Sequence, residues 1–358
     1  MTSQKATSTR IIAVYGATGH TGGYLLTELR RRGTSPILVG RDADRIRAAA
    51  AVAGLPDAEV RVAELTDHRA LVAAFTGVDA VISSLPAYVN HGAAVLTAAI
   101  DAGAHYTDMS GEQLFLRRVF DEFGPRAEAA GVTVVAGVTD SNLPGDLLGH
   151  LTTRRVAGPA AVTLSHLSNS GGNGSKGSAE TVLASLHWFR SGGWNYADGE
   201  WRTGTAARHD AMTFPGDTRP TPVAKFPQPA VLTIPRHSDV SYVEGVLATS
   251  ILDTLSGFTA EIIETLPDEP DSDLSYDLVV DAFGIDGRKV RGVLSGVDSY
   301  RDSALMAVET AMRLAEGSAA AGALAVAEAF DATGFLDALA PFGITWRIED
   351  GSAGVVEQ

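Results

Sequence analysis

The sequence predicts an α/β protein in which a doubly wound parallel sheet is followed by a second, α+β domain with a mixed or antiparallel sheet. Three observations lead to this fold class. Short apolar runs alternate with amphipathic stretches over residues 1–155. A glycine-rich turn joins the first run to the first amphipathic stretch. After about residue 156 the alternation gives way to loop-rich segments and longer strands.

Strands and helices are expected to alternate strictly through the first domain. The expected strands are 10–15, 36–40, 59–63, 79–83, 104–108 and 132–137. The expected helices are 21–32, 42–53, 67–76, 92–102, 113–130 and 144–154. Glycines suited to left-handed helix ends follow five of them, at Gly33, Gly54, Gly77, Gly103 and Gly131. Six strands with intervening helices are typical of nucleotide-binding sheets.

Three regions are expected along the chain. Residues 1–155 form the dinucleotide-binding domain, and residues 156–335 form an α+β domain for substrate binding and dimerisation. Within the latter we expect strands at 239–249 and 275–282 and helices at about 179–190 and 301–316. Residues 336–358 are expected to pack back on the first domain.

Composition excludes several classes of function. A net charge of −15 over 358 residues, with no basic stripe, argues against a nucleic-acid partner. The absence of cysteine excludes disulfides and thiolate metal sites, and no metal site is expected. No apolar segment reaches the roughly 20 residues that cross a bilayer. We therefore expect a cytoplasmic protein that acts on a small molecule.

The glycine-rich turn has the spacing Gly16-x-x-Gly19-x-x-Gly22. It follows a strand and opens a helix, as a Rossmann-type dinucleotide-binding turn must. The helix N-terminus and the glycine backbone would then hold a pyrophosphate. The cofactor-binding residues expected in this turn are Gly16, Ala17, Thr18, Gly19, His20, Thr21 and Gly22.

The end of the second strand predicts which dinucleotide is bound. Gly40-Arg41 stands where an NAD site usually places Asp or Glu. An arginine can pair with a 2′-phosphate, whereas a carboxylate would repel it. Asp42 is interpreted as the N-cap of the next helix. The sequence thus favours NADP(H) over NAD(H).

Later strand ends should line the same crevice. Leu65 and Thr66 follow the third strand, where adenine is expected. The remaining expected cofactor contacts, along the pyrophosphate and the nicotinamide, are Ser84, Leu85, Pro86 and Ser110.

The central loops also carry the candidate proton donors. None of the eight tyrosines has a lysine four residues later, which nearly excludes short-chain dehydrogenase chemistry. The expected catalytic groups are Tyr88, His91, Asp108 and Glu112. A structural role, as helix caps, is the alternative for Asp108 and Glu112. His166 stands alone in an alternating strand and is interpreted as a core or surface residue.

Several of these segments together resemble the saccharopine dehydrogenase-like oxidoreductases, whose relatives include the trans-acting enoyl reductases. The matching segments are residues 16–22, Gly40-Arg41, residues 84–88 and residues 104–112. The resemblance is strong over 10–115 and weak over 156–275. It implies an enzyme that transfers hydride between NADPH and a C=N or conjugated C=C bond of a small biosynthetic or metabolic intermediate. A homodimer is a further expectation from the family.

The loop after the sixth strand departs from the family pattern. The family usually has Gly-aromatic-Asp-Ser-x-Pro-x-Asp, whereas this chain has extra residues on both sides of Asp140-Ser141. Because this loop should border the reacting carbon, Asp140 and Asn142 are candidate substrate contacts. Lys176 and Ser178 are further candidates, at the start of a helix expected to face the cleft.

Two other functions fit the same cofactor turn. A non-catalytic NADP-binding regulator of the NmrA-like type would bind cofactor and turn over nothing. An isomerase that holds NADP as a redox helper is the third alternative. The polar stretch 105–112 favours the enzyme, because a sensor needs no protonatable groups at the nicotinamide.

Overall fold

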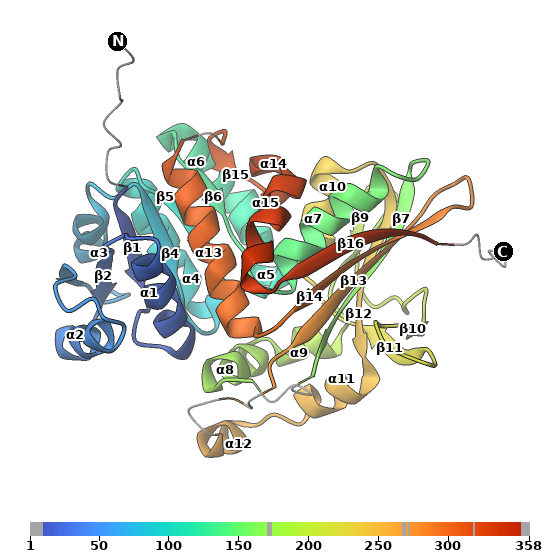
Figure 1. Cartoon of the computed structure of the whole chain (residues 1–358), viewed down its shortest axis with the longest axis horizontal. Helices are drawn as coiled ribbons and strands as arrows, with labels where there is room; N and C mark the ends of the chain where they lie inside the picture. Colours follow the sequence, from blue (N-terminus) through green and yellow to red (C-terminus); the bar gives the residue numbers. More distant parts are fainter. Residues whose placement is uncertain (1–9, 170–173, 267–269, 271–272, 318, 352–358) are drawn as a thin grey trace, which may run out of the picture.

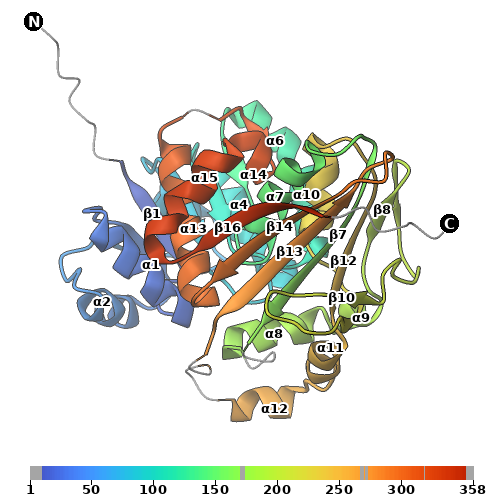
Figure 2. The ribbon, with the colours of Figure 1, turned by 45° about the vertical axis from the view of Figure 1, so that its right-hand side comes forward.

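Two β-sheets lie side by side in an elongated molecule, with helices packed between and around them (Figure 1). The computed structural model of the chain describes residues 10–169, 174–266, 270, 273–317 and 319–351. A view turned by 45° shows the strands of the second sheet more fully (Figure 2). The predicted fold class, a parallel sheet followed by an α+β part with a mixed sheet, is confirmed.

The first sheet has seven parallel strands in the order β15-β6-β5-β4-β1-β2-β3. Its strands are β1 (Ile12–Tyr15), β2 (Ile37–Gly40), β3 (Val60–Val62), β4 (Ala80–Ser83), β5 (His105–Asp108), β6 (Thr133–Val135) and β15 (Gly322–Ala323). The first six match the predicted strands to within two residues at each end. The order reverses between β1 and β4, which is where such sheets bind ligands.

Helices cover both faces of this sheet. They are α1 (His20–Arg31), α2 (Ala43–Val52), α3 (His68–Phe75), α4 (Tyr88–Asp101), α5 (Gln113–Arg118), the π-helical turn η1 (Val119–Phe123), α6 (Gly124–Ala130) and α7 (Asn142–Thr153). The five predicted helix-ending glycines all have φ between 70° and 78°. The alternation along β1 divides the core, since Ile12 and Val14 pack with α1 while Ala13 and Tyr15 pack with α3 and α4.

The second sheet is mixed and follows the order β10-β11-β12-β7-β13-β14-β16, with β8 and β9 beside β12. Its strands are β7 (Ala160–Ser168), β8 (Asn195–Ala197), β9 (Glu200–Arg202), β10 (Ala211–Met212), β11 (Thr221–Lys225), β12 (Val240–Ala248), β13 (Tyr276–Phe283), β14 (Lys289–Gly296) and β16 (Thr345–Gly351). Strands β7 and β12 run parallel, whereas β13 is antiparallel to both β7 and β14.

The remaining helices link or cover the sheets. They are α8 (Lys176–Ala184), α9 (Leu186–Arg190), α10 (Ala230–His237), α11 (Thr249–Ser256), α12 (Ala260–Thr265), α13 (Ser299–Ala315), α14 (Val326–Ala329), α15 (Ala332–Leu339) and the short 3₁₀ helix η2 (Ala340–Phe342). The predicted helix over 179–190 is divided at Ser185 into α8 and α9.

Helix α7 packs between the sheets and makes their cores continuous. Leu143, Leu147 and Leu148 on α7 are fully buried in the same cluster as Leu25 of α1 and Leu278 of β13. Helix α13 extends this cluster by lying beside α1 on the first sheet (Figure 1). The two halves thus share one apolar core.

The second and third regions predicted from the sequence do not coincide with the segments that build each sheet. Residues 299–323 return to the first sheet through α13 and β15, although they were expected in the second domain. Residues 336–358 were expected on the first domain, and Phe342 does lie against Arg31 of α1, but β16 pairs with β14 at the edge of the second sheet. Residues 352–358 lie outside the described residues. Backbone pairing explains both corrections, because β15 pairs with β6 and β16 with β14.

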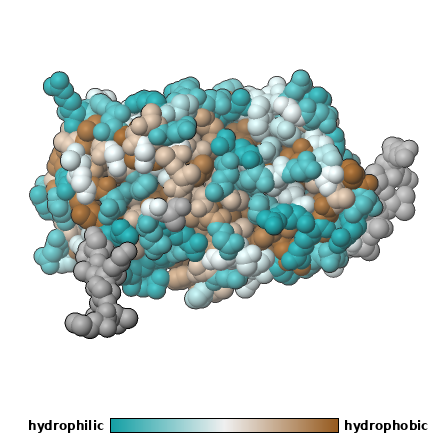
Figure 3. Space-filling view, turned by 90° about the horizontal axis from the view of Figure 1, so that it is seen from above, coloured by the Kyte–Doolittle hydropathy of each residue, from teal (hydrophilic) through white to brown (hydrophobic). Residues whose placement is uncertain are grey.

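The surface is mixed in character. Seen from above, hydrophilic residues cover much of the molecule and apolar residues appear in small groups (Figure 3). Within the described residues, no helix combines the length and the apolar character needed to cross a membrane.

Candidate functional site

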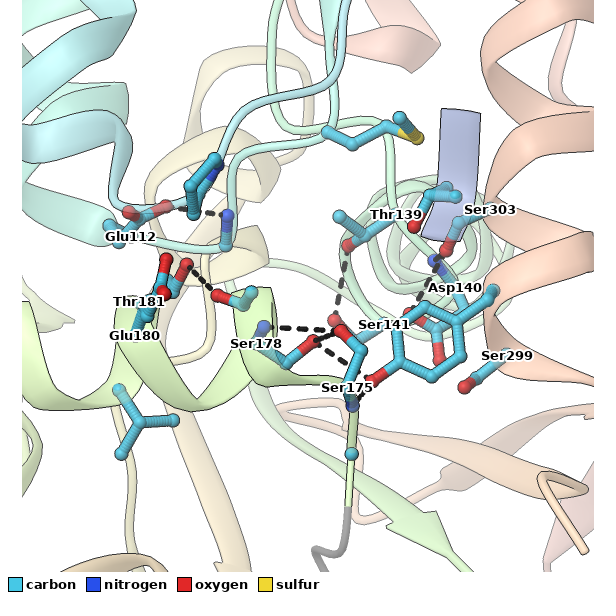
Figure 4. A pocket seen from close by; sticks show the side chains of 18 of the residues that line it. Glu112, Thr139, Asp140, Ser141, Ser175, Ser178, Glu180, Thr181, Ser299 and Ser303 are labelled. Carbon is cyan, nitrogen blue, oxygen red and sulfur yellow. Dashed lines mark hydrogen bonds between the residues drawn. The ribbon is translucent and has the colours of Figure 1, made fainter. Parts of the chain in front are cut away.

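A cleft of about 690 Å³ opens between the glycine turn and the second sheet. Its first wall is formed by the turn and by the loops after β4, β5 and β6. Helix α8 and the end of β7 form the opposite wall, and the start of α13 closes one side. Figure 4 shows Glu112 on one side of this cleft, Asp140 and Ser303 on the other, and Ser178 and Thr181 of α8 between them.

The glycine turn is closely packed at two of its three glycines. A Cβ on Gly16, whose φ is 97°, would lie 2.0 Å from the carbonyl oxygen of Ser84. A Cβ on Gly22 would lie 2.5 Å from the carbonyl oxygen of Gly16. A Cβ on Gly19 would meet only the Gly16 oxygen, at 3.7 Å, so this position faces open space. The turn therefore presents bare backbone on the side of the cleft.

The start of α1 fits the pyrophosphate of a dinucleotide. Its N-cap, Gly19, has no side chain to accept hydrogen bonds from the first helical N–H groups. Gly19, His20 and Thr21 all line the cleft. Nε2 of His20 is buried and has no hydrogen-bond partner. Such a helix end offers donors and positive potential to an anion.

Two other predicted residues of the turn lie outside the cleft wall. Thr18 is exposed and Ala17 is buried against the core. Among the residues after β4, by contrast, Ser84, Leu85 and Pro86 all line the cleft as expected.

At the end of β2, Asp42 accepts hydrogen bonds from the backbone N–H groups of Asp44 and Arg45, which confirms it as the N-cap of α2. Arg41 is exposed and lies outside the cleft lining, whereas Arg45 contributes to that lining. Leu65 and Thr66 follow β3 and do not line the cleft either. This edge of the site therefore carries two arginines, and the Asp42 carboxylate between them in sequence is engaged with backbone.

Tyr88 braces the strand ends from within. Its hydroxyl donates to the carbonyl oxygen of Ser83 at 2.6 Å and accepts from the N–H groups of Leu85 and Met109. Burial and the charge of Asp108 raise the pKa of this hydroxyl well above its usual value. With its proton held by Ser83, the hydroxyl positions two loops and has none to give to a substrate.

Glu112 joins two loops and keeps a place on the cleft wall. Its Oε1 accepts from the N–H of Tyr88 at 2.7 Å, and its Oε2 accepts from the N–H of Gly111 at 2.9 Å. Burial raises the pKa of this carboxyl to about 7, although those two N–H groups act to lower it. Glu112 can therefore exchange a proton near neutral pH.

Asp108 and Ser110 form an internal lock. Oδ1 of Asp108 accepts from the N–H groups of Ser110 and Gly137 and from the Ser110 hydroxyl. Burial raises the pKa of Asp108, and these hydrogen bonds oppose the shift. Neither residue lines the cleft. They fix the loops after β5 and β6. We therefore do not retain Asp108 as a proton donor or Ser110 as a cofactor contact.

His91 is exposed on α4 and lies outside the cleft lining, which removes it from the candidate proton donors. Asn142 is also displaced from its expected role. It is buried and donates through Nδ2 to the carbonyl oxygen of Gly137 at 2.5 Å. The amide thus anchors the loop before α7 and does not face a substrate.

Asp140, in the same loop, lines the cleft as expected. Its Oδ2 lies 3.0 Å from Nε2 of His166, a residue that also lines the cleft. The structure thus brings His166, which the sequence placed in the core or on the surface, to the site. The sequence carries no signal for this, since His166 shares a strand face with the fully buried Val162 and Leu164, which favours a core position.

The second-domain wall begins with α8. Lys176 and Ser178 both line the cleft, as expected. Ser178 and Ser175 contact the hydroxyl of Tyr300, which comes from the first turn of α13. Thr181 accepts from the N–H of Ala87, so α8 is tied to the loop after β4. The cleft-facing position of α8 was expected, whereas no sequence pattern indicated its contact with Tyr300 of α13.

The far end of the cleft is apolar. Its lining residues there are Val182, Phe189, Phe226, Pro229, Leu247, Ile251 and Leu255. The cleft therefore leads from an anion-binding helix end, past titratable groups, to a hydrophobic wall. This succession is typical of cofactor sites that also hold an organic substrate.

The sequence of residues 12–135 matches the family profile of the saccharopine dehydrogenase NADP-binding domain. Over these residues, the resemblance to the saccharopine dehydrogenase NADP-binding domain is confirmed. The match covers the strands and helices that carry the glycine turn, together with the loops bearing Tyr88 and Glu112.

Alignments with curated relatives cover only slightly more of the chain than this domain. A trans-acting enoyl reductase of Mycobacterium ulcerans is 29% identical over 150 residues, which are 41% of this chain and 36% of that protein. A lipid droplet localized protein of Caenorhabditis elegans is 30% identical over 146 residues, which are 38% of this chain and 34% of that protein. The alignments thus span about a third of these relatives.

The fold similarity covers nearly the whole chain. The saccharopine dehydrogenase (L-Glu forming) of Saccharomyces cerevisiae superposes with a TM-score of 0.59 over 96% of this chain and 100% of that one. The sequence identity is 12%. The second half of the molecule therefore shares the saccharopine dehydrogenase fold, and its chemistry has to be argued from its own residues.

Proposed function

We propose that the protein is an NADPH-dependent reductase that transfers hydride to a C=N or conjugated C=C bond of a small metabolic or biosynthetic intermediate. One observation carries the proposal. A single cleft connects the uncapped start of α1 with two sets of titratable groups, Glu112 after β5 and the pair formed by Asp140 after β6 and His166 near the end of β7. A protein that only senses the cofactor needs no titratable groups in the cleft beyond the start of α1.

The bound cofactor would supply a hydride, and the chain would position the acceptor of that hydride. The backbone at Gly19, His20 and Thr21 would hold the pyrophosphate. Ser84, Leu85 and Pro86 would border the rest of the dinucleotide along the cleft. An acceptor would lie between these loops and α8, with its unreactive part against the apolar wall.

NADP(H) is favoured over NAD(H) at the edge of the first sheet. Arg41 and Arg45 flank the end of β2, and the Asp42 carboxylate is occupied in capping α2. Guanidinium groups suit a 2′-phosphate. Replacing both arginines by alanine should weaken NADPH binding more than NADH binding. Fluorescence titrations of the wild type and of the double variant, each with NADPH and with NADH, measure this difference.

The proposal is tested by binding and turnover measured separately. NADPH binding is followed by fluorescence, and NADPH oxidation by absorbance with two probe acceptors, a cyclic imine and a conjugated enoyl thioester. Tight binding with steady oxidation of one probe supports the reductase. Tight binding without oxidation of acceptors of either bond type favours the NADP-binding regulator, and absence of binding contradicts both.

A homodimer remains part of the proposal because the second sheet ends in an edge strand, β16, whose other side is unpaired within the described residues. Light scattering on the purified chain measures the assembly directly. A monomer would remove this expectation.

A further inference from the structure

His166 and Asp140 form a pair that joins the two sheets across the cleft. His166 is near the end of β7, and Asp140 is in the loop between β6 and α7. Nε2 of His166 and Oδ2 of Asp140 are 3.0 Å apart. Their side chains retain 16% and 15% exposure, so both are sheltered yet reach the cleft.

Neighbouring elements hold both members in place. The Ser303 hydroxyl, from α13, accepts from the N–H of Asp140 at 2.9 Å and donates to its Oδ1 at 3.3 Å. The imidazole packs against the buried ring of Tyr276, with ring centres 5.3 Å apart. Figure 4 shows Asp140 and Ser303 together beside the cleft. Three elements therefore converge to orient one imidazole.

The pair leaves one ring nitrogen available. Nε2 faces Asp140, and Nδ1 makes no hydrogen bond to any described residue. An imidazole that is oriented by a carboxylate on one side and open on the other is suited to transfer protons near neutral pH. Glu112 differs, because both of its oxygens already accept backbone hydrogen bonds.

We propose that His166 is the proton donor of the reduction and that Asp140 is its positioning residue. The inference rests on the proposed reductase function. As the hydride and its electron pair form a new bond at one atom of the acceptor double bond, the π bond breaks. The atom at the other end takes a proton from the His166 imidazolium. The neutral imidazole then regains a proton from water.

Few other charges act on this imidazole. Among the described residues, Asp140 is the only charged group that pairs with it. Burial raises the pKa of Tyr276, so that ring stays neutral. Arg301 and Asp302 of α13 lie near Tyr276 and form an ion pair with each other.

The test is a histidine NMR titration of the whole chain with NADP⁺ and with NADPH. The H166Q variant assigns the resonance, and NADPH fluorescence shows that both proteins bind the cofactor. A proton donor beside the nicotinamide must sense its change of charge, so the pKa of His166 should be lower with NADP⁺ than with NADPH by about half a unit or more. D140N should lower the pKa of His166 in both complexes.

His68 is the control, because it is exposed on α3 and paired with Asp101 away from the cleft. Its titration should be the same with either cofactor. If His166 also titrates identically with NADP⁺ and NADPH while both bind, the donor assignment is overturned and the reductase proposal stands. If neither cofactor binds, the proposed function itself fails.

Turnover provides a second measurement with the probe acceptor that the wild type reduces. H166Q should lower kcat by about a hundredfold or more while NADPH affinity is unchanged. D140N should displace the alkaline limb of the kcat/KM profile to lower pH. Full turnover by H166Q with normal cofactor binding would contradict the assignment.

Discussion

Gly22 and Gly23 are adjacent in α1, yet their surroundings are opposite. A Cβ on Gly22 would lie 2.5 Å from the Gly16 oxygen and 2.7 Å from the backbone of Ala17. A Cβ on Gly23 would have nothing within 4 Å. The sequence motif requires the first glycine for close helix–strand packing and is silent about the second. This pair therefore separates the geometry of the motif from the general effect of glycine in a helix.

Gly22→Ala should force the turn apart, because the obstructing atoms are backbone and cannot move aside. We expect a loss of about 1–3 kcal/mol in unfolding free energy and markedly weaker NADPH binding. Gly23→Ala is the matched control and should stabilise the chain by about 0.5–1 kcal/mol through helix propensity. Urea denaturation and fluorescence titration measure both. Equal behaviour of the two variants would contradict the packed turn.

Glu112 predicts a pH effect on stability. Its folded-state pKa of about 7 exceeds the usual carboxyl value, so the protonated form is the one favoured by folding. This contribution is complete below about pH 4 and is lost as pH rises through 7, by about 3 kcal/mol at most. Glu112→Gln cannot ionise and should lack the loss. Its stability relative to wild type should improve between about pH 5 and pH 8. A constant difference would refute the raised pKa.

Helices meet at another buried ion pair, whose residues do not line the cleft. Asp146 of α7 lies 2.7 Å from Nε2 of His237 at the end of α10, and its other oxygen accepts from the N–H of Ala327 in α14. Burial acts to raise the pKa of Asp146 and to lower that of His237. The charge of the partner acts in the opposite direction on each group, so the pKa of Asp146 is lowered and the pKa of His237 is raised. The pair thus fixes three helices relative to one another.

Asp146→Ala should leave Nε2 of His237 and the N–H of Ala327 without their shared partner, at a cost of about 3–5 kcal/mol. In the wild type, the pair's contribution should fade as pH rises through the elevated pKa of His237 and as pH falls through the lowered pKa of Asp146. Thermal unfolding of both proteins across pH checks this. Asp44→Ala, at a carboxylate whose side chain is 97% exposed, is the control and should change little.

Local signals in the sequence predicted the elements of the first domain well. Apolar runs and helix-ending glycines such as Gly33 and Gly131 are set by neighbours in the chain. The two-residue strand β15 pairs with β6, more than 100 residues earlier in the sequence, and β16 pairs with β14 at the edge of the second sheet. No local sequence pattern marks either strand. The same reason hid the contact of His166 with Asp140, which exists only once both sheets are assembled.

At the scale of the molecule, one apolar core extends from the first sheet through α7 to the second. Residues of α13 belong to this core as well, so the first sheet is completed by a segment that follows the second. The two sheets should therefore lose their structure together, even though the chain exceeds the usual length of a two-state domain.

The four tryptophans, Trp188, Trp194, Trp201 and Trp346, all lie outside the first 155 residues. Trp194 and Trp201 pack against the core of the first sheet, whereas Trp346 lies on β16 of the second sheet. A variant that keeps only Trp346 therefore reports the second sheet by its fluorescence, while loss of NADPH binding reports the first. We expect the two signals to change at the same urea concentration. Separate midpoints, with cofactor binding surviving after Trp346 is exposed, would contradict the continuous core.

The most direct test of the account is a crystal structure of the complex with NADP⁺. We expect the pyrophosphate on the backbone of Gly19, His20 and Thr21, and the nicotinamide inside the cleft with open space between it and His166. A nicotinamide lying outside the cleft, or covered by apolar side chains with no room for an acceptor, would contradict the reductase. It would leave a cofactor-binding protein without chemistry.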